Sequence, residues 1–212
     1  MKESFDLANE NQYWLSYYRH NSIPFSPSLF AHTVFPYLSE NQSLCELGCG
    51  NGRDSVFFAK HKIRVDAFDL VKDEILFLQE NYSNEYLNFY WGDFSKLPAN
   101  LSNYNAIYSR FTMHSISETM ENSVLEWSYH ALKESGYLFV ESRSIKDPLL
   151  KQGKRLGSNE NFTDHYRRYM DIDIFCKKLT KIGFKIILAE ESDTFAITAD
   201  ESPVINRVIA MV

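Results

Sequence analysis

Three glycines at alternate positions, Gly48, Gly50 and Gly52, form the stretch of this sequence best suited to bind a ligand. Glycine adopts positive φ without strain, so a glycine loop lets a ligand approach the backbone closely. A short apolar run ending in Glu46 precedes the loop, and residues 53–61 after it are apolar at helical spacing. Because the first N–H groups of a helix lack partners within it, they can bind a ligand above the loop. An ordinary strand-to-helix turn would also fit this loop taken alone.

Two acidic residues follow the next two predicted strands. Asp69 ends a strand expected over residues 63–68, where a carboxylate can accept hydrogen bonds from two ribose hydroxyls. Asp93 follows a strand expected over 87–91, where its carboxylate could accept a hydrogen bond from an adenine amine and Phe94 could lie against the base. In open parallel sheets the ligand lies beyond the carboxyl ends of the strands. These groups therefore converge on one nucleoside-binding crevice.

In this order, the motifs resemble those of the class I S-adenosylmethionine-dependent methyltransferases. Residues 46–52 are similar to the first motif of that family, Asp69 to its ribose-binding acid, and residues 92–94 to its adenine-side motif. The glycines run G-x-G-x-G, which differs from the G-x-G-x-x-G of nicotinamide-binding folds. The resemblance implies S-adenosylmethionine as cofactor and S-adenosylhomocysteine as product. The cofactor-binding residues expected from these motifs and their surroundings are Arg19, Glu46, Gly48, Gly50, Asn51, Asp69, Leu70, Asp93, Phe94 and Ser109.

Predicted helices and strands alternate from residue 43 onward, which indicates a parallel sheet with helices on both faces. Strands are expected at 43–47, 63–68, 87–91, 104–109, 137–142, 184–190 and 204–212, and helices at 53–61, 72–82, 118–133 and 172–182. The resemblance implies that the last strand is antiparallel. We therefore expect an α/β, Rossmann-like, seven-stranded fold that forms a single domain over residues 1–212.

The residues before the sheet are rich in aromatic side chains, and we interpret residues 1–40 as a helical lid. Pro24 and Pro27 interrupt it, because each proline disfavours helix at the preceding residue. Ser28 is placed to cap a second helix over residues 29–38. A lid above the crevice would bring Tyr17 and Tyr18 to the substrate and Arg19 to the cofactor carboxylate, as a charge-assisted pair. Simple packing of these aromatic side chains on the sheet remains the alternative.

His114 is the candidate general base, because it follows the strand predicted at 104–109 and histidine titrates near neutral pH. Residues 143–170 break the alternating rhythm and read as a substrate-binding insertion. Arginine and tyrosine there can donate directed hydrogen bonds to an anion, and arginine can do so in bidentate fashion. A solvated insertion with scattered charge is the alternative. The expected substrate-binding residues are Arg110, Arg143, Tyr166, Arg167, Arg168 and Tyr169.

The stretch from Ile107 to Arg110, followed by His114, is similar to the corresponding part of phosphoethanolamine methyltransferases. In that family a histidine at this place pairs with a lid tyrosine, so the resemblance implies roles for His114 with Tyr17 or Tyr18. The leading expectation is N-methylation of a small anionic acceptor such as ethanolamine phosphate. The insertion also looks like that of small bacterial methyltransferases of surface-polysaccharide pathways, which leaves O-methylation of a sugar or capsule precursor open. A non-catalytic cofactor-binding module is a third reading.

The overall composition excludes several classes of partner. A net charge of −6 without a basic block argues against long nucleic acids, because phosphate neutralisation requires clustered Lys and Arg. No apolar run approaches the ~20 residues of a membrane span. No set of His, Cys and acidic residues has clear metal-ligand spacing. Since the N-terminal residues also lack a signal-peptide pattern, we expect a cytoplasmic protein without a metal.

Overall fold

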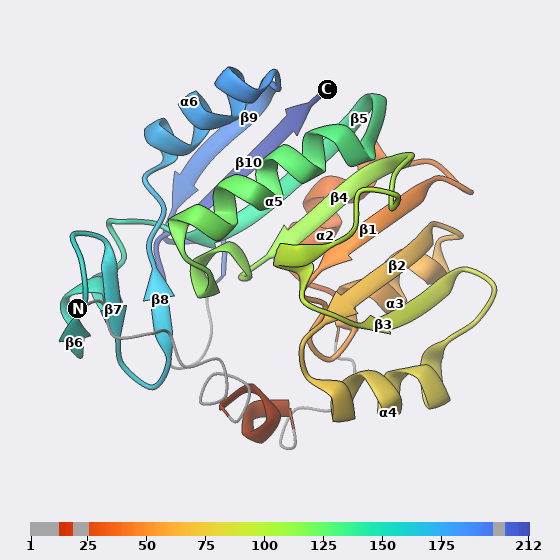
Figure 1. The fold of residues 1–212 in the computed structure, drawn as a ribbon, viewed down its shortest axis with the longest axis horizontal. Coiled ribbons are helices and arrows are strands. Elements are labelled where there is room, and N and C mark those ends of the chain that lie inside the picture. Colours follow the sequence, from red (N-terminus) through yellow and green to blue (C-terminus); the bar gives the residue numbers. More distant parts are fainter. Residues whose placement is uncertain (1–12, 19–25, 197–201) are drawn as a thin grey trace.

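The computed structural model describes residues 13–18, 26–196 and 202–212. Seven strands form one sheet in the order β3-β2-β1-β4-β5-β10-β9 (Figure 1). The five strands that run parallel in adjacent pairs are β1 (Ser43–Leu47), β2 (Arg64–Asp69), β3 (Leu87–Trp91), β4 (Tyr104–Arg110) and β5 (Leu132–Arg143). Strand β10 (Ile205–Met211) is antiparallel to both β5 and β9 (Lys185–Ser192). The expected mostly parallel seven-stranded sheet, with its last strand antiparallel, is confirmed.

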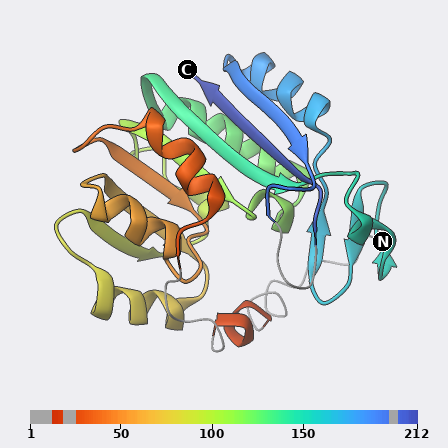
Figure 2. The ribbon, with the colours of Figure 1, turned by 180° about the vertical axis from the view of Figure 1, so that it is seen from behind.

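Helices cover both faces of this sheet (Figure 2). They are α2 (Leu29–Val34), α3 (Arg53–Lys60), α4 (Lys72–Tyr82), α5 (Glu118–Ala131) and α6 (Ile172–Ile182). Phe30, Phe58 and Ile75, from the first three of these helices, belong to one buried apolar cluster. Leu125 of α5 and Phe175 of α6 belong to a second cluster. The sheet therefore has an apolar core on each side, and its polar side chains concentrate at the strand ends.

Two element boundaries differ from the sequence expectation. The helix expected over 29–38 ends at Val34 and continues as a 3₁₀ turn, η1 (Phe35–Tyr37), which has proline in its first positions. Helix α5 ends at Ala131 and β5 begins at once, five residues before the expected strand. The pairing of β5 with β4 shifts register between Tyr104 and Ala106. Residues 133–136 are thereby accommodated as an irregularity rather than as the end of a helix.

The insertion has secondary structure of its own. It contains the 3₁₀ turn η4 (Pro148–Lys151) and an antiparallel sheet of β6 (Lys154–Arg155), β7 (Glu160–Phe162) and β8 (Tyr166–Arg168). Two further 3₁₀ turns follow strands of the main sheet, η2 (Phe94–Lys96) after β3 and η3 (Met113–Ser115) after β4. The small sheet and helical residues 13–18 lie beyond the carboxyl ends of the parallel strands (Figures 1 and 2).

A buried hydrogen-bond network joins α2 to α3 and β4. The Ser28 hydroxyl accepts from the Ala31 N–H at 3.0 Å, which caps α2. The same residue donates its N–H to Asp54 Oδ1 at 2.7 Å and its hydroxyl to Oδ2 at 2.8 Å. Tyr108 also donates to Asp54 Oδ2, at 2.8 Å. Three elements that flank the glycine loop are thus fixed to one carboxylate.

Replacing Ser28 by alanine is expected to lower the free energy of unfolding by about 1–3 kcal/mol. The substitution removes the helix cap and one donor to a buried carboxylate. Urea denaturation followed by circular dichroism measures the change. Ser39→Ala, at an exposed serine beyond η1, is the matched control and should change stability by less than about 0.5 kcal/mol. Equal stability of both variants would contradict the structural role of this network.

Candidate active site

The glycine loop is tied to the end of β2 and closely covered by the residues after β4. The N–H groups of Gly48 and Cys49 both donate to the Phe68 carbonyl oxygen, at 2.8 and 2.9 Å. Gly48 has φ 75° and Gly50 has φ 54°. A Cβ on Gly48 would lie 2.3 Å from Thr112 Cγ2, a distance that real Cβ contacts do not reach. Both the conformation and the space at this turn therefore require glycine.

Asp69 holds the predicted ribose position at the end of β2. Its Oδ2 accepts from the Gly50 N–H and its Oδ1 from the Val71 N–H, each at 2.9 Å. Burial raises the pKa of Asp69, and these backbone hydrogen bonds oppose that rise. The neighbouring Glu74 is buried, and its Oε1 has no hydrogen-bond partner in the described parts of the chain. Burial, with the charge of Asp69, raises the pKa of Glu74 to about 7.

The two other acids of the cofactor motifs have different surroundings. Glu46 is buried beneath the loop, where the Ser55 hydroxyl of α3 donates to its Oε2. Burial, and then the charge of Asp54, raises the pKa of Glu46. Asp93 caps η2 by accepting the Ser95 N–H at 2.9 Å. Burial acts to raise the pKa of Asp93, but hydrogen bonds from Ser95 and Lys96 outweigh it and lower the pKa.

The remaining expected cofactor residues surround the same loop. Phe94 is buried, with its Cε1 3.6 Å from the position a Cβ on Gly48 would occupy. Ser109 hydrogen-bonds to Thr112 at the end of β4. Asn51 lies buried within the loop, and Leu70 is partly exposed after Asp69. The cofactor contacts of these residues, like those of Glu46 and Asp69, remain predictions, and Arg19 lies outside the described residues.

The helical residues 13–18 lie above this crevice. The hydroxyl of Tyr18 lies 2.8 Å from the position a Cβ on Gly50 would occupy, so this side chain lies over the glycine loop. Burial, followed by the charge of Asp69, raises the pKa of Tyr18. Tyr17 is about half exposed, and its ring centroid lies 5.5 Å from that of Tyr18. The position of the two tyrosines fits the lid prediction, with Tyr18 facing the loop.

His114 lies in η3, directly after β4. Its side chain is buried, and its Nδ1 has no hydrogen-bond partner among the described residues. Its ring centroid lies 5.6 Å from that of Phe111, which has a φ of 55°. Burial lowers the pKa of His114 well below the usual range, and the charges of Arg143, His165, Arg167 and Arg168 add to this effect. The imidazole is therefore neutral at pH 7 and able to accept a proton.

The arginines expected to bind substrate already have acidic partners in the protein. Arg143 pairs with Asp147 at 2.8 Å and Arg167 with Asp164 at 2.6 Å. The Arg110 guanidinium lies 2.9 Å from a carboxylate oxygen of Glu141 on the adjacent strand β5. The two expected tyrosines are buried, and Tyr169 donates to Asn161 Oδ1 at 3.2 Å, whereas Tyr166 lies on β8. The positive charge in this region is thus largely compensated.

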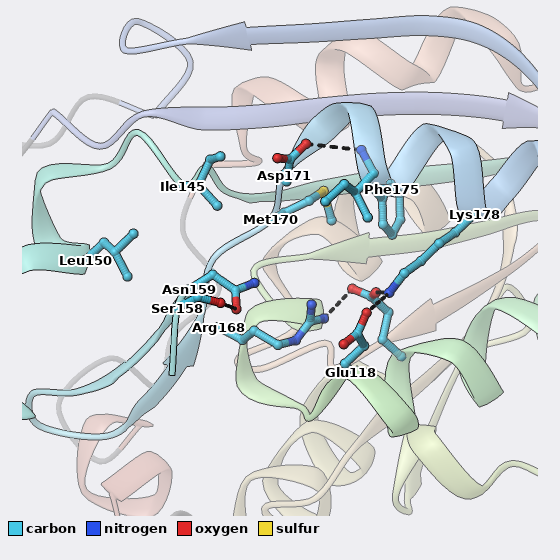
Figure 3. A pocket seen from close by; sticks show the side chains of 12 residues that line it. Glu118, Ile145, Leu150, Ser158, Asn159, Arg168, Met170, Asp171, Phe175 and Lys178 are labelled. Atoms are coloured by element: carbon cyan, nitrogen blue, oxygen red, sulfur yellow. Dashed lines mark hydrogen bonds and ion pairs between the residues drawn. The ribbon is translucent and has the colours of Figure 1, made fainter. Parts of the chain in front are cut away.

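Arg168 supports the turn that contains His114. It donates to the carbonyl oxygens of Ile116 at 3.1 Å and Met113 at 3.4 Å, and it pairs with Glu121 of α5. The same guanidinium borders a cavity of about 510 Å³ between α5, α6 and the insertion (Figure 3). Glu121 also pairs with Lys178 across this cavity. The lining of the cavity includes neither the glycine loop nor His114, so it is separate from the crevice.

His165, at the β7–β8 turn, joins the insertion to the lid. Its ring centroid lies 4.3 Å from that of Tyr13 and 4.9 Å from that of Trp14. The hydroxyl of Tyr13 donates to the adjacent Asp164 at 2.7 Å. The sequence offered only the proximity of His165 to the basic and aromatic residues 166–169 as a signal, and this contact between distant segments was not foreseen.

The pH dependence of stability should reveal the buried state of His165. Burial, with the charge of Arg167, lowers the pKa of His165 from 6.5 to about 4. Between these values the unfolded chain binds a proton that the folded chain does not, so this group makes stability fall as pH falls. We expect wild type to lose about 2 kcal/mol more than His165→Phe between pH 7 and pH 5, measured by urea denaturation. The difference between the two proteins removes the opposite effect of Glu74. Equal pH dependence would contradict the buried neutral ring.

Two searches of the described residues gave negative results. No group of three or more His, Cys, Asp or Glu side chains is arranged to hold a metal ion in the described part of the chain. Within those same ranges, no helix is both long and apolar enough to cross a membrane.

Comparisons with known proteins agree with this geometry. Residues 44–136 match a family model described as a methyltransferase domain. A search of curated proteins found no significant match. Three solved structures share the fold. The 1,6-didemethyltoxoflavin-N1-methyltransferase of Burkholderia thailandensis, with bound S-adenosylhomocysteine, has a TM-score of 0.72 and 15% identity, over 96% of this chain and 87% of that one.

The [4+2]-cyclase SpnF has a TM-score of 0.73 and 13% identity, over 99% of this chain and 96% of that one. A S-adenosylmethionine-dependent methyltransferase from Methanosarcina mazei has a TM-score of 0.70 and 16% identity, over 88% of this chain and 98% of that one. Residues 44–136 are thus a methyltransferase domain, and the chain has the fold and the cofactor, S-adenosylmethionine, of the class I S-adenosylmethionine-dependent methyltransferases.

Proposed function

We propose that the chain transfers a methyl group from S-adenosylmethionine to a small polar acceptor that meets His114 beneath the lid. The observation that supports this most strongly is a buried neutral imidazole at the end of β4, the strand next to β1 and its glycine loop. The crevice fits the cofactor, because Gly48 and Gly50 leave space that a Cβ would fill and Asp69 is fixed at the ribose position. Gly48, Gly50 and Asp69 would hold the nucleoside, with Phe94 beside it.

The protein has two tasks in this reaction, because the bound cofactor supplies an already activated methyl group. The first is alignment of the acceptor, which can lower the barrier by roughly 7–11 kcal/mol. The lid and the insertion are placed to do this, and they also exclude water. The second is removal of a proton from the acceptor, for which neutral His114 is the group available. Arg168 acts as a positioning residue, since it holds the carbonyl groups on either side of that imidazole.

A phosphorylated amino alcohol, methylated on nitrogen, is the first candidate acceptor. Arg143 and Arg167 act electrostatically on His114, so a phosphate bound to them would bring an attached amine near the base. The phosphate would have to compete with Asp147 and Asp164, the present partners of the two guanidinium groups.

A sugar hydroxyl, including that of a capsule or surface-polysaccharide precursor, is the second candidate. The compensated arginines favour it, because an uncharged acceptor requires no net positive field. A hydroxyl also depends on a base more than an amine does, and His114 is buried in the form that accepts a proton.

Binding and transfer can be measured with the full-length chain. We expect S-adenosylhomocysteine to bind with micromolar affinity in calorimetry. Incubation with methyl-tritiated S-adenosylmethionine and either ethanolamine phosphate or a set of nucleotide sugars, followed by mass spectrometry, then identifies the product. Absence of S-adenosylhomocysteine binding would overturn the proposed function. Binding without transfer to any acceptor would favour a non-catalytic cofactor-binding module.

A further inference from the structure

Two buried histidines in the same region have unsatisfied ring nitrogens. His114 is 4% exposed and His165 is 3% exposed. Nδ1 of His114 and both ring nitrogens of His165 have no hydrogen-bond partner within residues 13–18, 26–196 and 202–212. Leaving a buried polar group unpaired costs about 1–3 kcal/mol, so such a group needs an explanation. A bound molecule that supplies the missing partners is one.

The surroundings of His165 leave few partners within the protein itself. Tyr13 and Trp14 lie against its ring, at centroid distances of 4.3 and 4.9 Å. Asp164 Oδ1 lies 3.3 Å from Nδ1 without making a hydrogen bond to it, and this carboxylate already accepts from Tyr13 and Arg167. The lid thus holds the ring in place, and its nitrogens remain available to a ligand.

The two imidazoles lie in the same electrostatic environment. The charges of Arg143 and Arg167 act on both rings, and His165 itself acts on His114. These three residues come from the end of β5 and from the β7–β8 hairpin, and His114 comes from η3 after β4. The chamber between η3, the insertion and the lid is therefore lined by two neutral rings and by arginines that are already paired.

We propose that His165 is a second acceptor-contacting residue beside His114, and that the pair selects an acceptor bearing hydroxyl groups. This inference rests on the proposed methyl transfer. A neutral imidazole has one N–H donor and one nitrogen acceptor, and a hydroxyl group likewise both donates and accepts. Phosphate oxygens mainly accept, so they would leave the acceptor nitrogen of each ring unpaired. Asp147 and Asp164 also cancel the charges that a phosphate would need.

The transfer step balances with the groups at hand. The acceptor oxygen forms a bond to the methyl carbon, and its proton passes to neutral His114. The electron pair of the broken carbon–sulfur bond stays on sulfur. The products are a methyl ether, S-adenosylhomocysteine and a protonated His114, which returns its proton to solvent when the lid opens. His165 orients the hydroxyl, or a neighbouring one, through hydrogen bonds.

Imidazole ¹⁵N–¹H spectra of the full chain saturated with S-adenosylhomocysteine provide a direct test. Glucose and inorganic phosphate are added separately at equal concentration, and His114→Phe and His165→Phe assign the two rings. We expect glucose to shift both ring signals and phosphate to shift neither. A response to phosphate alone, to both probes or to neither would overturn the inference. Failure of S-adenosylhomocysteine to bind at all would instead contradict the proposed function.

Kinetics of the His165→Phe variant provide a second test. Phenylalanine keeps the aromatic contact with Tyr13 and Trp14 but removes both ring nitrogens. We expect the KM for a hydroxyl acceptor to rise about tenfold, with the smaller change in kcat. Tryptophan fluorescence on S-adenosylhomocysteine binding should stay unchanged, which shows that the lid still packs. His130→Phe, at an exposed histidine of α5, is the control. An unchanged KM in His165→Phe would refute the contact.

Discussion

Replacing Asp69 by alanine is expected to weaken S-adenosylhomocysteine binding at least about 100-fold. A hydrogen bond to a charged group contributes roughly 1.5–3 kcal/mol, and the carboxylate is placed to accept two ribose hydroxyls. The substitution also removes the acceptor of the Gly50 and Val71 N–H groups, both at 2.9 Å, and so loosens the glycine loop. Isothermal titration calorimetry measures the dissociation constant.

Asp73→Ala is the matched control for this result. Asp73 is exposed in the first turn of α4, four residues after Asp69, so its loss should change the dissociation constant less than about twofold. Asp69→Asn keeps one acceptor oxygen and should fall between wild type and Asp69→Ala. Near-wild-type binding by a folded Asp69→Ala protein, checked by circular dichroism, would mean that this carboxylate does not hold the ribose.

Replacing His114 by alanine is expected to lower kcat about 10²–10⁴-fold, the usual contribution of a positioned base. S-adenosylhomocysteine binding should change only a few-fold, because the expected nucleoside contacts come from the glycine loop and Asp69. Since the pKa of His114 is lowered, wild-type activity should persist as pH falls through 6.5 and decline only below it. Radiometric assays of product formation over pH 5–9 measure both effects.

His130→Ala, which removes an exposed histidine of α5, should retain wild-type kcat. An acidic decline in wild-type activity centred at or above pH 6.5 would argue against His114 as the group that accepts the proton. A His114→Ala protein with full kcat would leave the nearby tyrosines, Tyr17 and Tyr18, as the remaining candidates.

Short-range patterns predicted the parts of the fold that short-range physics determines. Strands β1 and β3 and helices α4 and α6 match their expected bounds, because alternating or helical apolar spacing ends at clear turn residues. Gly183, with φ 127°, ends α6 as expected. The continuous passage from α5 into β5 could not be foreseen, because it depends on how β4 and β10 receive residues 132–136.

The charge balance of the site was hidden for a different reason. Arg168 pairs with Glu121, which lies 47 residues earlier in the chain. The Tyr13–Asp164 hydrogen bond spans 151 residues. A sequence shows that arginines are present, but only the folded chain shows which carboxylates face them. The basic cluster that predicted an anion site is therefore close to neutral once these partners are counted.

The helical residues 13–18 touch two sites at once, through Tyr18 over Gly50 and Tyr13 on Asp164. One short rigid element that both ligands must bury under makes their affinities interdependent. By thermodynamic reciprocity, the factor by which the acceptor tightens cofactor binding equals the factor by which the cofactor tightens acceptor binding. The helix also has to leave both sites before either product departs. Its opening is thus a single step shared by two release events, and it can set the turnover rate even when methyl transfer itself is fast.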